Sequence, residues 1–296
     1  MRNIPTITGI WQTLRRVKQQ IDDDRVLAVS AGVTFYVVLA MIPALTALIS
    51  LFGLVSAPQD VPGQLTSLTG IMPVEAATLL TEQATRIAAK PSGALSLTAL
   101  IAIGIAVWSA NGGTKALIEA LGIAYGVKET RGFVRLNLVS LGFTFGGLLF
   151  AVVLGGLVAA LPLILEWLMR GQSAETVILW GRWPIVIAVL LSVLALLYRL
   201  GPDWPSVQKA WITPGAVVAA LGLIVTSSAL GWYVSNFGSY DETYGSLAAV
   251  VVLMLWVWLS TIVVLIGAEI NAELDRKSGV SHVGQDGMRK VEPSLT

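Results

Sequence analysis

The sequence predicts an all-α integral membrane protein with six transmembrane helices, both ends of the chain in the cytoplasm, and a first helix kinked at Pro43. Three observations lead to this prediction. Of the 296 residues, 55% are hydrophobic and only 12% are charged, whereas soluble domains carry about 25% charged residues. Apolar windows of about 20 residues, the length that spans a bilayer, recur along the chain. Lys and Arg gather in alternate connections, as they do in cytoplasmic loops.

The predicted spans follow from windows that contain no charged residue. Five such windows reach spanning length: 26–59, 91–114, 136–165, 210–240 and 243–268. A sixth, 183–198, is short and spans only when 176–181 joins it, which leaves Arg182 near one end. A long Arg side chain can reach the interface from such a position. The six predicted helices are 26–55, 93–114, 136–165, 177–198, 211–235 and 243–269.

The basic residues set the predicted orientation. Of the 19 Lys and Arg residues, 15 fall in the N-terminal flank, the second and fourth loops and the C-terminal tail, and four fall in the first and third loops. Because cytoplasmic flanks are enriched in Lys and Arg, both termini are predicted to be cytoplasmic. The chain then divides into a cytoplasmic basic segment (1–25), a six-helix transmembrane domain (26–275) and a polar cytoplasmic tail (276–296) predicted to be disordered.

Two segments outside the spans have the pattern of amphipathic helices. In 7–21, apolar residues share one helical face and basic residues lie off it, which is typical of a helix lying on a membrane surface. Segment 73–89 falls in the first external loop and opens with Pro73 and Glu75, a helix start. Two interpretations of this second segment stay open: an interfacial helix, or a helix packed on neighbouring loops.

Composition excludes several classes of function. The net charge of +1 gives no basic field to attract nucleic acid. There is no cysteine, and the only histidine, His282, lies in the polar tail, so disulfides and His- or Cys-based metal sites are not expected. No P-loop is present. We therefore expect no cofactor and no metal, and the lipid bilayer as the principal partner.

Small residues at helical spacing predict close helix contacts, which do much of the packing in lipid. Gly142 and Gly146 form a GxxxG pattern in the third predicted helix. Similar spacings join Ala28 to Gly32 and Gly215 to Ala219. Two uses remain open: packing within one chain, and a homo-oligomer built on these faces.

Pro43 interrupts the first predicted helix. The charge-free stretch 26–54 would be about 43 Å long as a straight helix, more than the ~30 Å hydrocarbon core. Proline removes the donor to the carbonyl of Leu39 and kinks the helix, and the freed carbonyl should face protein or water. Two interpretations stay open: a plain packing kink, or a broken helix at a cavity, as transporters use.

Three stretches of the sequence carry a resemblance to a known family. They are SAGVTFYVVLAMIPALTAL at 30–48, WSANGGTKALIEALGIAYGVKETRGFVR at 108–135, and the stretch 233–274 with its Tyr-Gly-Ser start and Gly-Ala-Glu-x-Asn end. They resemble the YihY/BrkB family of bacterial inner-membrane proteins, formerly labelled ribonuclease BN, over roughly residues 10–275. Gly122 departs from the pattern, which has Asn there. The resemblance implies six helices with both ends inside and an inner-membrane location.

Polar residues near the cytoplasmic ends of the spans are candidates for a substrate cavity. Glu269 follows Gly267 and Ala268 at the end of the last predicted helix, where with Asn271 it would line a cytoplasmic mouth, paired with a basic residue of the second loop. The alternative is an interface marker beside an ordinary surface pair of Glu273 and Lys277. The cavity candidates are Tyr36, Pro43, Asn111, Lys115, Glu119, Arg131, Arg135, Glu269 and Asn271.

Two further groups have both a structural and a functional interpretation. Lys115 and Glu119 follow Gly112 and Gly113; they form a helix-surface pair, or the glycines break the helix and expose backbone dipoles to a substrate. The last external turn is interpreted as an aromatic belt, or as an external gate made negative by its acids. The gate candidates are Asn236, Tyr240, Asp241 and Tyr244.

The resemblance and the cavity candidates together favour a permease or flippase-like transporter of a lipid-linked or small polar solute, and not an enzyme. The alternative is a structural or scaffold membrane protein of the cell envelope that transports nothing. No ionisable residue falls at mid-depth in the predicted spans, which argues against a proton-coupled pump. A ribonuclease is disfavoured, because His282 lies in the tail and Asp241 lies on the external side.

Overall fold

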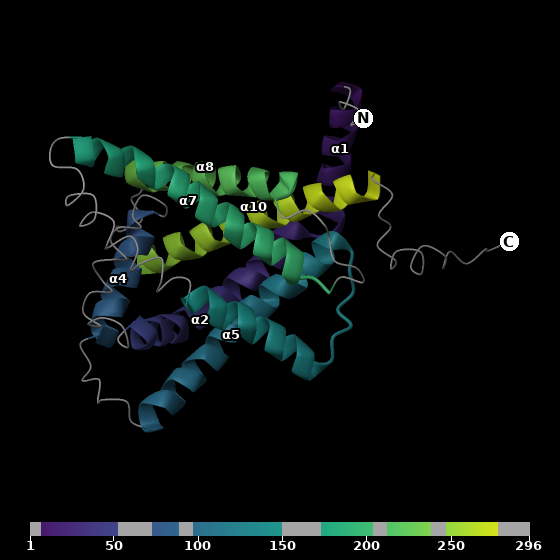
Figure 1. Cartoon of the computed structure of the whole chain (residues 1–296). Coiled ribbons are helices and arrows are strands. Elements are labelled where there is room, and N and C mark those ends of the chain that lie inside the picture. The colour runs from purple at the N-terminus through teal and green to yellow at the C-terminus, as the bar shows by residue number, and fades with distance from the viewer. Residues whose placement is uncertain are drawn as a thin grey trace.

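The computed structural model consists of helices, with no strand in the part of the chain that it describes. The described residues are 7–52, 73–88, 97–149, 173–203, 212–237 and 247–277. Helices α2, α5, α7, α8 and α10 pack into one bundle, and α1 projects from the end where α10 finishes (Figure 1). An all-helical membrane protein is therefore confirmed.

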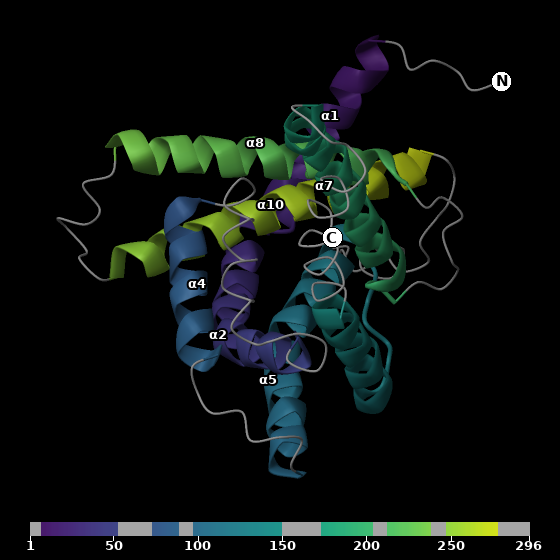
Figure 2. The ribbon, with the colours of Figure 1, turned by 60° about the vertical axis from the view of Figure 1, so that its left-hand side comes forward.

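The N-terminal helix α1 (Ile7–Asp23) and the first long apolar helix α2 (Val26–Phe52) are joined by a tight turn. Arg25 adopts the left-handed conformation with φ of 49°, and the Asp24 N–H still donates to the Gln20 carbonyl over 2.8 Å. The helix predicted over 7–21 is confirmed. The ribbon of α2 contains Pro43 and changes direction along its length (Figure 2), as a helix with an internal proline does.

Helix α5 (Leu97–Tyr125) runs without a break through Gly112 and Gly113. A Cβ on Gly113 would lie 3.2 Å from the Cα of Val37, so the glycine lets α5 approach α2 closely. The interpretation that these glycines break the helix is therefore wrong.

The end of α5 explains why glycine suits position 122. Gly126 has a positive φ of 65° and ends the helix, and the Val127 N–H donates back to the Gly122 carbonyl over 2.8 Å. A Cβ on Gly122 would come within 3.1 Å of the Val127 carbonyl oxygen. An Asn side chain at this position would crowd that cap.

The later helices lie in the regions of the predicted spans, as far as the described residues extend. They are Phe133–Leu149, α7 (Ser173–Leu200, with Pro184 inside), α8 (Pro214–Phe237) and α10 (Ala248–Lys277). Within the described ranges, three helices are long and apolar enough to cross a membrane: Val26–Leu48, Pro214–Asn236 and Ala248–Arg276. Phe133–Leu149 and Ile187–Leu200 are shorter apolar helices. The number of six spans stays a prediction.

Helix α4 (Val74–Ala88) occupies the segment predicted as an amphipathic helix. Its small residues Ala76, Ala77 and Ala84 are buried, and it packs against α2 and α10. The observed packing is against two helices and not against loops, so the choice between an interfacial helix and a helix packed on neighbouring loops stays open.

The core of the bundle lies where α2, α5, α7, α8 and α10 converge. Tyr125 and Tyr198 are both 1% exposed and meet edge to face with centroids 6.2 Å apart. The Tyr198 hydroxyl donates to the Val264 carbonyl over 2.7 Å. Gly215 and Gly267 sit at the crossing of α8 and α10, where a Cβ on Gly215 would overlap the Gly267 carbonyl. The predicted close contact at Gly215 is thus within one chain.

Candidate functional site

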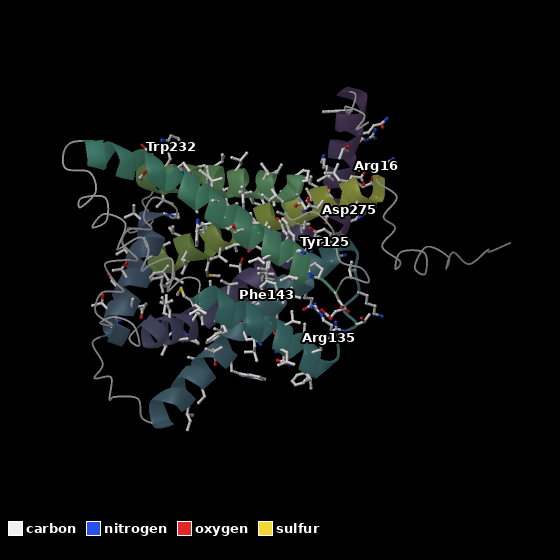
Figure 3. All side chains as sticks on the ribbon, in the orientation of Figure 1. Arg16, Tyr125, Arg135, Phe143, Trp232 and Asp275 are labelled. Atoms are coloured by element: carbon white, nitrogen blue, oxygen red, sulfur yellow. The ribbon has the colours of Figure 1, made fainter. Side chains whose placement is uncertain are left out.

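Charged side chains concentrate at the end of the bundle where α5, α7 and α10 finish and α2 and α8 begin. In Figure 3, Arg16, Tyr125, Arg135 and Asp275 all lie toward this end, whereas Trp232 lies toward the opposite end. This is the end that the basic residues predict to be cytoplasmic. Two groups of side chains occupy it, one around the last two turns of α10 and one in the connection after α5.

Asn271 is the centre of the first group. Its side chain is buried, and its Oδ1 accepts a hydrogen bond from the Gly215 N–H over 2.8 Å. Its Nδ2 donates to the Tyr125 hydroxyl over 3.0 Å. The first turn of a helix leaves backbone N–H groups without partners, and Asn271 satisfies one of these at the start of α8. Asn271 therefore ties α5, α8 and α10 together and does not line an open cavity.

Glu269 lies two residues earlier on α10 and is 0% exposed. Neither of its carboxylate oxygens has a hydrogen-bond partner. The charged groups that act on it are the Asp24 carboxyl, from the turn between α1 and α2, and the Arg276 guanidinium, two turns further along α10. The guanidinium of Arg276 faces the Gln20 side-chain amide. The apolar window predicted that Glu269 ends the last helix. Glu269 instead lies inside this helix, because α10 continues to Lys277.

Glu273 is also buried, but it has a partner. An Arg16 guanidinium nitrogen lies 3.3 Å from its Oε1, and the Arg16 side chain is 63% exposed. Glu273 is therefore not the surface residue that the predicted pair with Lys277 requires, because α10 continues past 269 and α1 covers this face. The Lys277 side chain lies outside the described residues.

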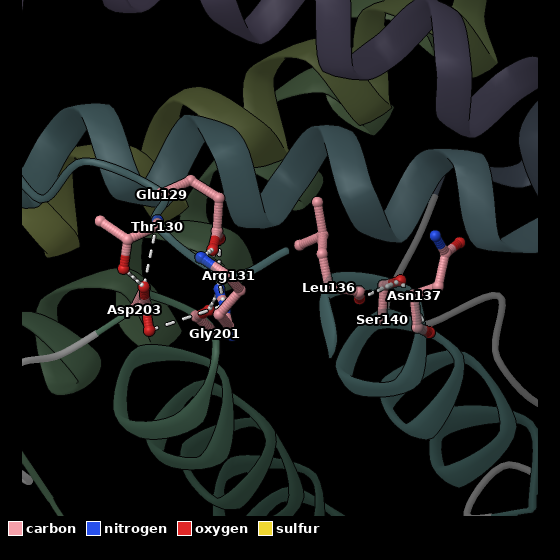
Figure 4. A network of polar contacts seen from close by, with 8 residues as sticks. All are labelled: Glu129, Thr130, Arg131, Leu136, Asn137, Ser140, Gly201 and Asp203. Atoms are coloured by element: carbon pink, nitrogen blue, oxygen red, sulfur yellow. Dashed lines mark hydrogen bonds and ion pairs between the residues drawn. The ribbon is translucent and has the colours of Figure 1, made fainter. Parts of the chain in front are cut away.

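The second group, which we call the loop clasp, consists of Glu129, Thr130, Arg131, Gly201 and Asp203 (Figure 4). The Arg131 guanidinium donates to both carboxylate oxygens of Glu129, over 2.8 and 2.5 Å, and to the Gly201 carbonyl over 2.7 Å. The hydroxyl and the N–H of Thr130 both donate to Asp203 Oδ2. The clasp fastens the connection after α5 to the end of α7.

The electrostatics of the clasp favour its charged forms. Hydrogen bonding to Glu129 raises the pKa of Arg131 although burial opposes this, and the charges of Glu129 and Asp203 add to the increase. Burial alone would raise the pKa of Asp203, but the hydrogen bonds from Thr130 and the charges of Arg131 and Arg135 lower it overall. The predicted pairing of Arg131 or Arg135 with Glu269 is wrong, because Glu129 and Asp203 hold Arg131, and Arg135 is exposed beside Asp203.

A third polar group is buried deeper, between α5 and Phe133–Leu149, and we call it the interhelical network. The Thr144 hydroxyl donates to Asn111 Oδ1 over 3.3 Å and lies 2.8 Å from the Thr114 hydroxyl. It also bonds the Ser140 carbonyl over 2.9 Å. Asn111 is 1% exposed, and its Nδ2 has no hydrogen-bond partner.

The remaining cavity candidates lie apart from these groups. The Lys115 ammonium sits over the rings of Trp108 and Phe133, 5.5 and 5.9 Å from their centroids. Glu119 is exposed and forms no ion pair with Lys115. The predicted surface pair of these two residues is therefore wrong.

Two cavity candidates, Tyr36 and Pro43, lie on α2. Tyr36 is 49% exposed on the outside of the bundle, beside Phe35. Pro43 lies about 28 Å of helix away from Asp24, the residue at the start of α2 that faces Glu269. Pro43 thus lies far along α2 from the turn that faces Glu269, and a single cytoplasmic cavity that joins these two candidates stays a prediction.

Of the predicted gate, only Asn236 falls among the described residues. It is exposed, and its Nδ2 donates to the Trp232 carbonyl over 2.8 Å. Tyr240, Asp241 and Tyr244 lie outside the described residues.

Sequence reasoning missed the residues that complete the three groups. Asp24 stands in a run of three acids that has the pattern of a solvated surface, and Asp203 follows Gly201 and Pro202 with no periodic signal. Tyr125 stands at the end of an apolar run, and the sequence pattern does not show that its hydroxyl points into the bundle. Only the pairing of a Tyr with an Asn, each located shortly after a predicted span, could have suggested it. In the described residues, no three His, Cys, Asp or Glu side chains group as metal ligands would.

Comparison with known proteins gives a family match and several relatives. Residues 17–291 match the family described as Virulence factor BrkB. The ribonuclease-like protein YfkH of Bacillus subtilis (strain 168) is 36% identical over 189 residues, which are 60% of this chain and 66% of the relative. A UPF0761 membrane protein of Azoarcus sp. (strain BH72) is 26% identical over 269 residues, 88% of this chain and 63% of the relative.

Shorter matches show the same kind of relative. A UPF0761 membrane protein of Alteromonas mediterranea is 43% identical over 84 residues, 28% of each chain. The chain thus spans less than two thirds of the length of these UPF0761 relatives. No solved structure matches.

Proposed function

The chain belongs to the BrkB family of membrane proteins, and from that premise we propose that it is a permease or flippase-like transporter of a lipid-linked or small polar solute. We place it in a bacterial inner membrane with six spans and both ends in the cytoplasm. The observation that carries the proposal is the interhelical network, because it puts polar groups between helices that are otherwise apolar.

A buried amide donor without a partner is unfavourable by roughly 1–3 kcal/mol. Asn111 keeps such a donor, and the neighbouring hydroxyls of Thr114 and Thr144 can turn either way. A scaffold gains nothing from this arrangement, whereas a passing polar solute would find donors and acceptors in place. Proline inside α2 and α7 adds support, since transporters use interrupted helices where a path opens.

Lys115 supports an anionic or zwitterionic passenger. It lies one turn along α5 from Asn111, on a part of the bundle where Trp108 and Phe133 are 55% and 75% exposed. Lipid would face these two rings, and a basic group between them suits a phosphate head group. The proposal therefore favours a lipid-linked solute over a neutral one.

The test is a lipid-scrambling assay with the purified chain in proteoliposomes that contain a fluorescent phospholipid. Dithionite added outside bleaches the outer half at once, and bleaching beyond half reports transbilayer movement. We expect movement with the wild type and a loss of at least tenfold in Thr144→Val. Thr46→Val is the matched control, because the Thr46 hydroxyl bonds only its own helix, to the Ile42 carbonyl over 2.9 Å.

Two outcomes of this assay would contradict the proposal. One is a wild type that moves neither the fluorescent lipid nor, in a parallel swelling assay, small polar solutes. The other is equal movement in Thr144→Val and Thr46→Val.

A scaffold built from several copies is the second candidate, favoured by small residues that no described residue covers. A Cβ on Gly32, Gly142 or Gly146 would meet no described atom within 4 Å. Open small-residue faces suit contact with a second copy. Gly142→Leu should then convert an oligomer to a monomer in detergent, as measured by light scattering, and an unchanged mass would remove this candidate.

A ribonuclease remains disfavoured, although one relative carries a ribonuclease-like name. RNA cleavage needs a metal-held water or a positioned acid and base, and His282 is the only histidine. We expect no cleavage of RNA by the homogeneous protein. Cleavage that disappears in a point variant of this chain would contradict that expectation.

The proposed orientation has a direct test of its own. A periplasm-active reporter fused after Thr296 should be inactive, and the same reporter inserted between residues 240 and 244 should be active. The reverse pattern would overturn the orientation without touching the transport proposal.

A further inference from the structure

Two carboxyl groups meet at the buried end of α10 with no donor between them. Glu269 is 0% exposed, and both of its oxygens lack a hydrogen-bond partner. The carboxyl that faces it belongs to Asp24 and comes from the turn between α1 and α2. Ionised carboxylates are acceptors only. Two of them in contact in a buried place repel each other unless something positive stands between them.

The surroundings do not supply that positive group directly. From its own helix, the Arg276 charge acts on Glu269, but the guanidinium forms no ion pair with it and faces Gln20 of α1. Glu273, one turn further on, is occupied with Arg16 of α1.

Among the described residues, no cation other than Arg276 is found to act on Glu269. From α5, Tyr125 presents a hydroxyl that accepts from Asn271, and from α8, Gly215 presents backbone. Arg25, at the start of α2, is exposed. Glu269 and Asp24 together therefore carry one negative charge more than Arg276 balances.

We propose that Asp24 and Glu269 form a proton-binding site in which one proton is held between the two carboxyls. In the loaded state the O–H of one carboxyl donates to a carboxylate oxygen of the other, so one oxygen of each carboxyl gains a hydrogen-bond partner. On release the O–H bond breaks and the proton passes to water, leaving two carboxylates. Asp24 is only half-buried, which makes it the exit toward the cytoplasmic end of the bundle.

The proton fits this place better than a metal ion does. Ca²⁺ takes six to eight oxygen ligands and Mg²⁺ requires an octahedron, whereas two carboxyl side chains meet here. The oxygens nearest along α10 and α5 are committed, since Asn271 Oδ1 accepts from Gly215 and the Tyr125 hydroxyl accepts from Asn271. A single shared proton removes the excess negative charge and needs only the two acceptors that are present.

The site places an ionisable pair at the cytoplasmic part of the last membrane helix, beyond the mid-depth region where the sequence shows no ionisable residue. Ionisable residues in spans are commonly proton relays. The assignment does not depend on transport. Asp24 follows α1 and faces Glu269 of α10, and Arg16 of α1 pairs with Glu273 of α10. In the proposed transporter, a change in cytoplasmic pH would therefore act on the contact between α1 and α10.

Infrared spectroscopy of the purified chain in lipid nanodiscs at neutral pH tests the proposal. A protonated carboxyl has a carbonyl stretch distinct from carboxylate bands and shifted in D₂O. We expect one such band in the wild type and its loss in both Glu269→Gln and Asp24→Asn, since an amide then donates to the remaining carboxylate. The control is Glu273→Gln, one turn away, in which the band stays because Glu273 pairs with Arg16 and is not part of the Asp24–Glu269 site.

The outcomes separate the alternatives. A band that persists in Asp24→Asn but not in Glu269→Gln would place the proton on Glu269 alone and overturn the sharing. Absence of the band in the wild type, with thermal stability that rises with Na⁺ or Ca²⁺ only when Glu269 is present, would replace the proton by a metal cation. If Glu269→Gln fails to fold, Asp24→Asn carries the test, because its side chain is half-buried.

Discussion

The loop clasp and the Asp24–Glu269 pair treat charge in opposite ways at the same end of the bundle. In the clasp, Arg131 has a side chain only 4% exposed, yet it makes ion pairs with two acids and a hydrogen bond to a carbonyl. In the pair, Glu269 is equally buried and has no donor. The two groups are near neighbours, because the connection that forms the clasp starts directly after Tyr125, whose hydroxyl binds Asn271.

The difference indicates which group holds the fold and which is kept for function. Removing one partner of a buried ion pair strongly destabilises the fold. The clasp therefore holds the connection after α5 against the residues that follow α7. A buried acid without a donor reduces stability, and its retention calls for a use. The exposed fractions of the Arg131 and Glu269 side chains are both low and do not separate the two residues. Their hydrogen-bond and ion-pair partners do.

The largest expected effect comes from the packing that encloses the pair. Gly215→Val places a side chain where the Gly267 carbonyl and Asn271 already lie. The overlap involves backbone, so α8 and α10 must separate, with a loss of about 3 kcal/mol or more in the free energy of unfolding. Gly32→Val is the matched control, since no described atom lies within 4 Å of its added Cβ. Equal melting temperatures for the two variants in detergent would show that the crossing is looser than described.

The second effect tests the clasp itself. Arg131→Met keeps the bulk of the stem but leaves Glu129 and Asp203 without their cation, and we expect a loss of about 2–3 kcal/mol in stability. Lipid scrambling per folded molecule should be unchanged, because the clasp is a fastening. Arg135→Met, at an exposed position, should have a much smaller effect. A variant that melts normally but fails to scramble would reverse the roles assigned to the two groups.

The third effect is a dependence on pH. The pKa of Asp203 is lowered in the folded chain, so its stabilising contribution is complete above the ordinary Asp value and is lost as pH falls through the lower folded value. The loss therefore belongs below about pH 4. The wild type should lose stability on acidification relative to Asp203→Asn, which is less stable at pH 7 but lacks this acid-sensitive step. Parallel unfolding curves for the two proteins between pH 7 and pH 3 would remove Asp203 from the clasp.

The helices could largely be predicted from the sequence, because charge-free length is set by the bilayer. The span predicted over 211–235 corresponds to α8 at Pro214–Phe237. The end of α10 could not be predicted in this way. Glu269 is the first charge after the apolar window, but the helix continues because Asn271 and Ala272 pack into the bundle. Hydropathy locates where a helix leaves lipid, and not where it ends.

The partners of the charged side chains could not be predicted. Arg131 was expected beside Glu269, but the turn at Gly126 redirects the chain after α5 toward Asp203. Asp24 was not singled out, since its role depends on the turn at Arg25. Each of these contacts is fixed by a connection and not by a helix period, and connections carry little pattern to predict from.

The smallest expected effect concerns the ion pair between Arg16 and Glu273, one turn from Glu269 on α10. Arg16 is 63% exposed while Glu273 is 3% exposed, so water screens one side of the pair. Exposed pairs contribute about 0–1 kcal/mol, and Arg16→Gln should lower the free energy of unfolding by no more than about that amount. The effect should instead be local, because α1 also packs through Val17, which is 5% exposed. Amide hydrogens of α1 should exchange faster in Arg16→Gln while those of α8 do not change, as measured by hydrogen exchange with mass spectrometry. Exchange that accelerates equally in α8 would mean that Arg16 supports the whole bundle, and the contrast between fully and partly compensated charges would then fail at this residue.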